Sequence, residues 1–223
     1  MIFQIGPLMA DQSQCDDPKS ASITNAVCLF SNPLLVGASL TRGYGANPGG
    51  PGAIIAATLS PESQITNMAQ SGVKSVDSLK DHVIPANAPS IVMGLDLFFW
   101  DAARNDCDAS FIGKTKSFIK LYQDRKIPMI LGKLPLGVKF PKGYSVLNNT
   151  ECTKKINDLL DSECTIENNC LIYDPKECFA KMSEADRNRY FVDSLHTSAE
   201  ANKFCSKVFI AGNQYQKLTC QPK

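Results

Sequence analysis

The sequence predicts a three-layer α/β/α fold with a central, mainly parallel sheet, formed by residues 1–223 as a single domain. Short apolar runs alternate along the chain with segments of helical periodicity, which is typical of parallel sheets buried on both faces. A length of 223 residues with 43 % apolar and 20 % charged side chains suits one globular domain with a sizeable core.

Five segments have the length and composition of buried strands, namely residues 33–37, 64–69, 90–96, 128–132 and 170–174. The third is the clearest, because Ile91, Val92 and Met93 form an unbroken apolar run. The first ends at Gly37, where a turn into a helix is expected.

Helices are expected between these strands, at residues 38–43, 53–59, 76–83, 114–124 and 198–210. The segment 114–124 places Phe118, Ile119 and Tyr122 at amphipathic spacing. The last helix has Thr197 or Ser198 as its capping residue. Residues 1–30 are expected to be irregular, and the glycine-rich residues 43–52 to form a loop.

Nine cysteines are many for a cytosolic protein of this size, so we expect a secreted or periplasmic protein with disulfides. Residues 140–180 interrupt the alternation, and we interpret them as a cysteine-rich insertion within the domain. Four cysteines in it are candidates for local disulfides: Cys152, Cys164, Cys170 and Cys178. The odd total leaves at least one thiol free or paired between chains, and spacing alone does not give the connectivity. No pair has C-x-x-C spacing, so no metal is expected.

Charge and hydropathy exclude several classes of partner. The 23 basic and 22 acidic side chains nearly cancel, so a nucleic-acid partner is not expected. No apolar run reaches 18 residues, so no transmembrane segment is expected. Residues 1–8 are too short and lack the basic residues of a complete signal peptide, so we expect the natural signal to have been removed. We expect a monomer.

Three chemically useful residues follow predicted strands, at the sheet edge where parallel α/β proteins bind ligands: Ser39, Gly72 and Asp96. Near the carboxyl terminus, Asp193 and His196 form an Asp-x-x-His pair. A neutral imidazole can take the proton of a serine hydroxyl, and a carboxylate on its other nitrogen fixes the tautomer. These residues therefore predict a catalytic triad of Ser39, His196 and Asp193.

The order of these residues resembles that of the SGNH (GDSL-type) hydrolases, a three-layer α/β/α family of esterases, lipases and carbohydrate deacetylases. The family's first block, often G-D-S-x-T-x-G, is similar to residues 37–43, and its last block, D-x-x-H, to residues 193–196. The glycine of its second block is similar to Gly72, and its third block, G-x-N-D, to residues 94–97. The resemblance extends from about Leu34 to Phe209.

The resemblance implies a serine hydrolase that cleaves carboxylic esters, such as short acyl or acetyl esters of lipids or carbohydrates, without a metal or organic cofactor. Backbone N–H groups of Ser39 and Gly72 would bind the oxyanion, with Asp96 at the third position of that site. The chain departs from the family pattern at Ala38, where aspartate is usual, and at Asp96, where asparagine donates to the oxyanion. An ionised aspartate would repel the developing charge.

Each of these residues also has a structural interpretation, and His196 of the Asp-x-x-His pair can be a surface polar group near a helix start. Ser39 can be a helix cap, Gly72 a simple turn residue, and Asp96 a structural hydrogen-bond acceptor or the equivalent of the block's final aspartate. The rival function is a degenerate SGNH domain that binds a carbohydrate or a protein without turnover.

The substrate is expected to contact residues that adjoin the proposed catalytic groups. The candidates are Leu40, Arg42, Phe98 and Leu195, and the loop 43–52 is expected to border the groove. The aromatic run that contains Phe98 can equally pack in the core.

Overall fold

A computed structural model describes the chain over residues 18–44, 49–75, 77, 88–104, 106–135, 150–192 and 196–220. Its centre is a five-stranded sheet in the order β2-β1-β3-β4-β5, and every pairing is parallel. The strands are β1 (Pro33–Leu35), β2 (Thr66–Asn67), β3 (Ile91–Gly94), β4 (Met129–Gly132) and β5 (Cys170–Tyr173). All five lie within the segments that the sequence predicts.

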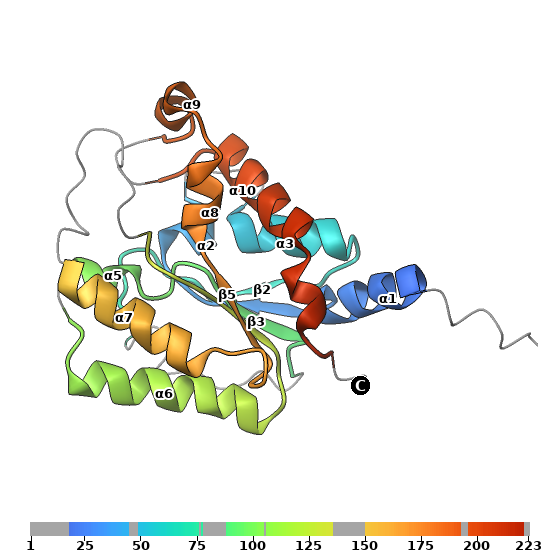
Figure 1. The fold of residues 1–223 in the computed structure, drawn as a ribbon, viewed down its shortest axis with the longest axis horizontal. Coiled ribbons are helices and arrows are strands. Elements are labelled where there is room, and N and C mark those ends of the chain that lie inside the picture. The colour runs from blue at the N-terminus through green and yellow to red at the C-terminus, as the bar shows by residue number, and fades with distance from the viewer. Residues whose placement is uncertain are drawn as a thin grey trace, which may run out of the picture.

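The helices of the described residues cover both faces of this sheet (Figure 1). They are α1 (Pro18–Phe30), α2 (Ser39–Arg42), α3 (Pro51–Leu59), α5 (Phe99–Ala103), α6 (Ala109–Asp124), α7 (Thr150–Glu163), α8 (Pro175–Ala180), α9 (Glu184–Arg189) and α10 (Ala199–Gly212), with the 3-10 helix η3 (Gln214–Lys217). The predicted three-layer α/β/α fold is therefore confirmed.

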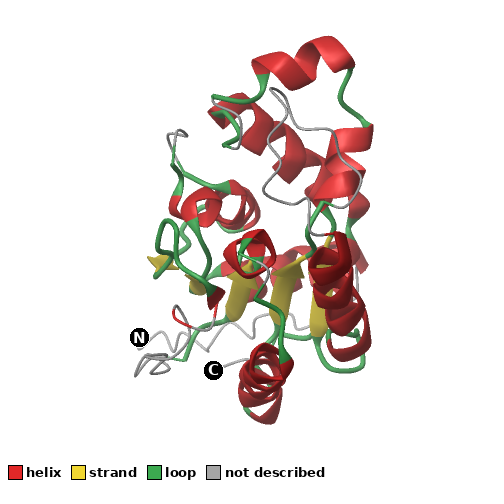
Figure 2. Ribbon diagram, turned by 90° about the vertical axis from the view of Figure 1, so that its left-hand side faces the viewer, coloured by secondary structure: helices red, strands yellow, loops and turns green. Residues whose placement is uncertain are grey.

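Alternate residues of each strand face opposite layers, as the two-residue period of a strand requires. Leu34, Val92 and Leu131 belong to a core cluster shared with α6 and α7. Leu35 and Met93 belong to a second cluster, shared with α1, α3 and η3. Figure 2 shows helices on either side of the strands. Because both faces are covered, β1, β3 and β4 consist of buried, mostly apolar residues, whereas the edge strand β2 is exposed and polar.

The strand order creates a switch point beside β1. The chain passes from β1 to the edge strand β2, returns to β3 on the other side of β1, and then adds β4 and β5. Connections at the carboxyl ends of β1 and β3 therefore diverge, which leaves a crevice where ligands bind in open α/β sheets. Ser39 and Asp96 follow these two strands.

Five α-helices of the described residues lie where the sequence predicts none: α1, α5, α7, α8 and α9. α1 occupies residues that we expected to be irregular, and its Leu29 and Phe30 are fully buried in the core. α7 lies in the expected insertion, with Ile156 and Leu160 buried against the sheet. Of the predicted helix at residues 76–83, all but residue 77 falls outside the described residues.

The cysteine-rich segment is part of the central architecture. Its described part, residues 150–180, supplies α7, the edge strand β5 and α8, so it continues the alternation of strands and helices that we expected it to interrupt. Residues 140–149 lie outside the described residues.

All four candidate cysteines form disulfides, but the expectation that they pair locally is wrong for two of them. Cys164–Cys170 is local, whereas the other described bonds cross the fold: Cys28–Cys220, Cys107–Cys152 and Cys178–Cys205. Pairing depends on which helices meet, which spacing does not encode. The ninth cysteine, Cys15, lies outside the described residues.

The disulfide Cys28–Cys220 should contribute more stability than Cys164–Cys170, because cross-linking a longer loop removes more entropy from the unfolded chain. The sequence separations are 192 and 6 residues. We expect replacement of both cysteines by serine to lower the free energy of unfolding by about 5 kcal/mol for the first bond and about 2 kcal/mol for the second. Urea denaturation of the two double variants measures this, and equal losses would contradict the loop-length argument.

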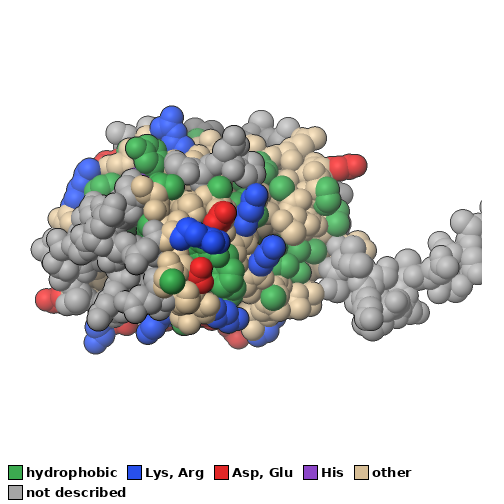
Figure 3. Space-filling model, turned by 90° about the horizontal axis from the view of Figure 1, so that it is seen from above, with side chains coloured by type: hydrophobic (Ala, Val, Ile, Leu, Met, Phe, Trp, Pro, Cys, Tyr) green, Lys and Arg blue, Asp and Glu red, His purple; other side chains and the backbone are tan. Residues whose placement is uncertain are grey.

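The surface shows no strong bias of charge. In Figure 3, Lys and Arg side chains lie intermixed with Asp and Glu over the middle of the face that is seen from above. Arg189 of α9 and Glu200 of α10 form an ion pair with 3.2 Å between the charged groups. Within the described ranges, no helix has the length and apolar character needed to cross a bilayer.

Candidate functional site

A tight turn after β1 carries Ser39 into the first residue of α2. The N–H of Val36 still donates to the carbonyl of Met93 at 2.9 Å, so the turn begins from paired backbone. Gly37 has φ +153°, and a Cβ there would lie 2.3 Å from a carboxyl oxygen of Asp96. Only glycine allows Asp96 to approach the turn so closely.

Asp96 holds this turn from the neighbouring strand. Its Oδ1 accepts hydrogen bonds from the N–H of Ala38 at 3.0 Å and from the Thr41 hydroxyl. Its Oδ2 accepts from the N–H of Leu40 at 2.8 Å and of Thr41 at 3.3 Å. Burial raises the pKa of the Asp96 carboxyl, and the hydrogen bonds from Thr41 and the backbone oppose this rise.

These contacts give Asp96 the structural role that the sequence left open as an alternative. Both carboxyl oxygens are occupied by donors from the residues around Ser39, so Asp96 offers an oxyanion no donor group. The N–H of Ser39 itself has no hydrogen-bond partner among the described residues.

His196 is presented by a short antiparallel pairing of the chain that leads into α10. Phe191 and Thr197 form an isolated β-bridge, and the N–H of Val192 donates to the carbonyl of His196 at 2.9 Å. Next along the chain, Ser198 caps α10 by accepting from the N–H of Ala201 at 3.2 Å. The position of the ring is thus set by a helix start and a bridge together.

The structure brings Ser39 and His196 into contact although 157 residues separate them. His196 Nε2 lies 2.8 Å from Ser39 Oγ, a hydrogen-bonding distance. Ser39 is buried and His196 is half-buried. On the solvent side, the exposed ring of Tyr44 packs against the imidazole with 4.3 Å between ring centroids.

Within the described residues, the other predicted catalytic and oxyanion residues are not seen in contact with Ser39 or His196. Asp193 and Leu195 lie outside the described residues. Gly72 is in a turn with φ +76°, and its carbonyl accepts from the Arg104 guanidinium at 2.9 Å. The chain that leads to Gly72 runs beside the turn that carries Ser39, since the N–H of Gln70 donates to the carbonyl of Gly37.

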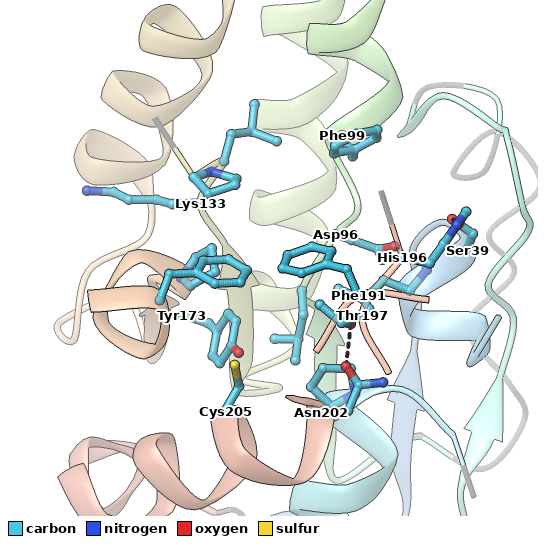
Figure 4. A pocket seen from close by; sticks show the side chains of 17 residues that line it. Ser39, Asp96, Phe99, Lys133, Tyr173, Phe191, His196, Thr197, Asn202 and Cys205 are labelled. Carbon is cyan, nitrogen blue, oxygen red and sulfur yellow. Dashed lines mark hydrogen bonds between the residues drawn. The ribbon is translucent and has the colours of Figure 1, made fainter. Parts of the chain in front are cut away.

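A pocket of about 750 Å³, measured to include its open mouth, adjoins Ser39 and His196 (Figure 4). Its lining consists of Ser39, Leu40, Pro51, Leu95, Asp96, Phe99, Lys133, Leu134, Pro135, Tyr173, Pro175, Phe179, Phe191, His196, Thr197, Asn202 and Cys205.

Of the four expected lining residues, Leu40 lines this pocket and Leu195 lies outside the described residues. Pro51, which belongs to the segment 43–52 that was expected to border the groove, also lines it.

Phe98 is fully buried and packs edge-to-face on Phe111 in the core, so the next residue, Phe99, faces the pocket instead. Arg42 is exposed and lies away from it. Which of Phe98 and Phe99 faces the pocket depends on the direction of the side chains at the start of α5, and the sequence does not show that direction.

Much of the lining was missed by sequence analysis, although part of it had a signal. Lys133 directly follows β4 and Tyr173 ends β5, the positions where parallel sheets present functional residues. Asn202 had no signal: it is buried, and it accepts a hydrogen bond from the hydroxyl of Thr197 at 2.5 Å.

The arrangement suits nucleophilic chemistry at a serine. A neutral imidazole at 2.8 Å can accept the hydroxyl proton as Ser39 attacks. The described part of the chain contains no group of three or more His, Cys, Asp or Glu that could hold a metal ion.

No protein-family model matches the chain, and no curated protein matches it in sequence. Solved structures do match its fold. An esterase from a Pseudoalteromonas species superposes with a TM-score of 0.57 at 17 % identity, covering 81 % of this chain and 95 % of its own. An acetylxylan esterase from Geobacillus stearothermophilus has a TM-score of 0.56 at 14 % identity, covering 86 % and 97 %.

A third match is a structure described as a lipolytic protein of the G-D-S-L family, from Desulfitobacterium hafniense. It has a TM-score of 0.56 at 18 % identity, covering 80 % of this chain and 97 % of its own. Together with the parallel sheet and its strand order, these matches show that the protein has an SGNH/GDSL-type hydrolase fold.

Proposed function

We propose that the protein is a serine hydrolase of carboxylic esters in which Ser39 is the nucleophile, His196 the general base and Asp193 the residue that orients the imidazole. The observation that carries the proposal is the 2.8 Å contact between Ser39 Oγ and His196 Nε2 at the switch point of the sheet. The named structural neighbours, which are esterases on the same fold, support this reaction class.

In the first step, Ser39 Oγ attacks the ester carbonyl carbon while His196 Nε2 takes its proton. The resulting oxyanion accepts hydrogen bonds from the N–H of Ser39, which has no partner among the described residues, and from the N–H of Gly72. The C–O bond then breaks, and His196 returns the proton to the leaving alcohol. Water attacks the acyl-serine while His196 takes its proton; the bond from the acyl carbon to Ser39 Oγ then breaks, and His196 returns the proton to Oγ as the acid is released.

Asp193 stands three residues before His196, so one short loop can present both side chains. Its carboxylate on Nδ1 would hold the tautomer in which Nε2 accepts the serine proton. Asp96 is a positioning residue in this scheme, because it fixes the turn that carries Ser39 and does not touch the reacting atoms.

The contacts of Asp96 also weaken the rival function, a non-catalytic binding module. That alternative rested on an acidic residue at an oxyanion position. Because the carboxyl group instead binds the N–H groups of Ala38, Leu40 and Thr41, it no longer argues against turnover. The four disulfides favour an oxidising compartment, so we also propose that the protein is exported.

Covalent labelling by a fluorophosphonate tests the proposal, because only an activated serine reacts. We expect one adduct at Ser39, mapped by peptide mass spectrometry, and none in Ser39→Ala or after heat unfolding. The matched control, Ser63→Ala, removes a serine of the loop after α3 and should be labelled as the wild type is. A native protein that the probe does not modify at Ser39 would refute the hydrolase and leave the binding module.

A further inference from the structure

The lining of the pocket beside Ser39 and His196 indicates which kind of substrate group it can bind. Figure 4 shows Ser39 and His196 on one side of it and Lys133 on the opposite side, with the rings of Phe191 and Tyr173 between. A substrate group attached to Ser39 can therefore extend into the pocket across these side chains.

Most of the wall is hydrocarbon. It comes from the ends of β3 and β4, from α8 and from the segment before His196, and its apolar members include Leu95, Phe99, Leu134, Phe179 and Phe191. The rings of Phe179 and Phe191 stack with 5.9 Å between centroids, which makes a flat apolar surface. Such a wall gains free energy by removing apolar surface of a ligand from water.

The charged side chains in the wall offer no free charge to a ligand. The ammonium of Lys133 is paired with Asp161 at 2.6 Å, so its aliphatic stem is what remains for the pocket. The carboxyl group of Asp96 is occupied by the nucleophile turn. Burial, and then the nearby Asp174, raise the pKa of the Tyr173 hydroxyl, which therefore stays neutral.

Two further polar side chains of the wall satisfy each other. The hydroxyl of Thr197 donates to Asn202 Oδ1 at 2.5 Å, and the Asn202 amide donates to the carbonyl of Gly49 at 3.5 Å. A sugar or another polyhydroxylated group would lose water at this wall and regain few hydrogen bonds there, chiefly at the hydroxyl of Tyr173.

We propose that this pocket binds an apolar acyl chain, so that the substrates are esters of carboxylic acids longer than acetate. The inference rests on the proposed hydrolase function. The acyl group is the part of an ester that stays bonded to Ser39 Oγ, which lies in the wall. The alcohol that takes the proton from His196 can leave on the open side, where the Tyr44 ring is 55 % exposed.

The first test compares 4-nitrophenyl acetate, butyrate, hexanoate and octanoate, which share one leaving group. We expect kcat/KM to rise by up to about fourfold per added methylene, and by at least about tenfold from acetate to hexanoate. A maximum at acetate would overturn the inference while leaving the hydrolase intact. A parallel series of acetates with longer alcohols should show no such rise; a rise there alone would assign the pocket to the alcohol and overturn the acyl assignment.

Substitution of Leu134 changes the room in the pocket in either direction. The backbone of Leu134 is held on both sides by Asn157, with its N–H donating at 2.9 Å and its carbonyl accepting at 3.0 Å. Its side chain is buried and belongs to the core cluster as well as to the pocket wall, so urea denaturation is used to check that each variant is folded. We expect Leu134→Trp to lower the hexanoate-to-acetate ratio of kcat/KM by about tenfold, and Leu134→Ala to move the optimum to a longer chain.

The matched controls are Leu121→Trp and Leu121→Ala in α6, a partly buried leucine that does not line the pocket, and they should keep the wild-type ratio. An optimum that stays the same in both Leu134 variants, while they fold and turn over ester, would overturn the inference.

Binding to Ser39→Ala separates this inference from the hydrolase proposal. By saturation-transfer NMR, we expect hexanoate to bind and acetate not to bind, and Leu134→Trp in the same background to abolish hexanoate binding. Hexanoate binding in a protein that hydrolyses no ester would refute the reaction and keep the pocket. Ester turnover by the wild type without hexanoate binding to Ser39→Ala would refute the acyl-chain pocket and keep the hydrolase proposal.

Discussion

Replacement of His196 by alanine is expected to lower kcat for a 4-nitrophenyl ester by about 10⁴-fold or more while KM stays close to that of the wild type. The reason is the 2.8 Å contact of His196 Nε2 with Ser39 Oγ: without the imidazole, no described group is placed to take the hydroxyl proton. The apolar wall that binds substrate remains. Steady-state kinetics over a range of ester concentrations separates the two parameters.

The double variant Ser39→Ala, His196→Ala makes this prediction sharper. If the two residues act as one unit, it should lose about as much activity as either single variant, because removing the second partner of a broken unit changes little. His82→Ala, which removes the chain's other histidine, is the matched control and should keep wild-type kinetics. Losses that multiply in the double variant would show that Ser39 and His196 act independently.

Replacement of Asp96 by alanine is expected to lower the free energy of unfolding by about 3–5 kcal/mol and to slow labelling of Ser39 by a fluorophosphonate. The substitution leaves the N–H groups of Ala38 and Thr41 buried without their acceptor, together with the N–H of Leu40. The turn that aims Ser39 then loses its only carboxyl partner among the described residues. Urea denaturation measures the loss of stability. The rate of Ser39 labelling, compared under conditions where the variant and the wild type are both folded, measures the effect on positioning.

Two other variants distinguish positioning from a general loss of folding. Thr41→Val removes one hydroxyl donor and keeps all three N–H bonds to Asp96, so it should cost much less in both measurements. Asp96→Asn keeps one acceptor oxygen and should recover part of the labelling rate. If Asp96→Ala labels as fast as the wild type under conditions where both are folded, Asp96 has no part in positioning Ser39.

Several features of the fold could be predicted from the sequence because they depend on local patterns. Four of the five strands are short apolar runs, and the alternation of these runs with helices implies a parallel sheet with two covered faces. α6 was foreseen from Phe118, Ile119 and Tyr122 because its buried stripe is clear. α7 was not, because many polar side chains surround its buried Ile156 and Leu160.

Some features of the candidate site could likewise be predicted from the sequence, and others could not. Ser39 and His196 could be singled out because each lies in a short motif at a strand or helix boundary, which residue order alone reveals. The role of Asp96 could not be decided, because a carboxyl group after a strand can face the oxyanion or the turn, and only the approach allowed by Gly37 shows which.

The sequence by itself therefore indicated the class of fold, the oxidised character of the cysteines and the two residues, Ser39 and His196, that we propose to react. Only the tertiary structure decided that the pair meets across 157 residues, which cysteines bond, and that Phe99 rather than Phe98 faces the pocket. Periodicity and capping act over a few neighbouring residues and can be read along the chain. Contacts between distant segments depend on how strands are ordered and how side chains are turned, and these are set by the packing of the whole core.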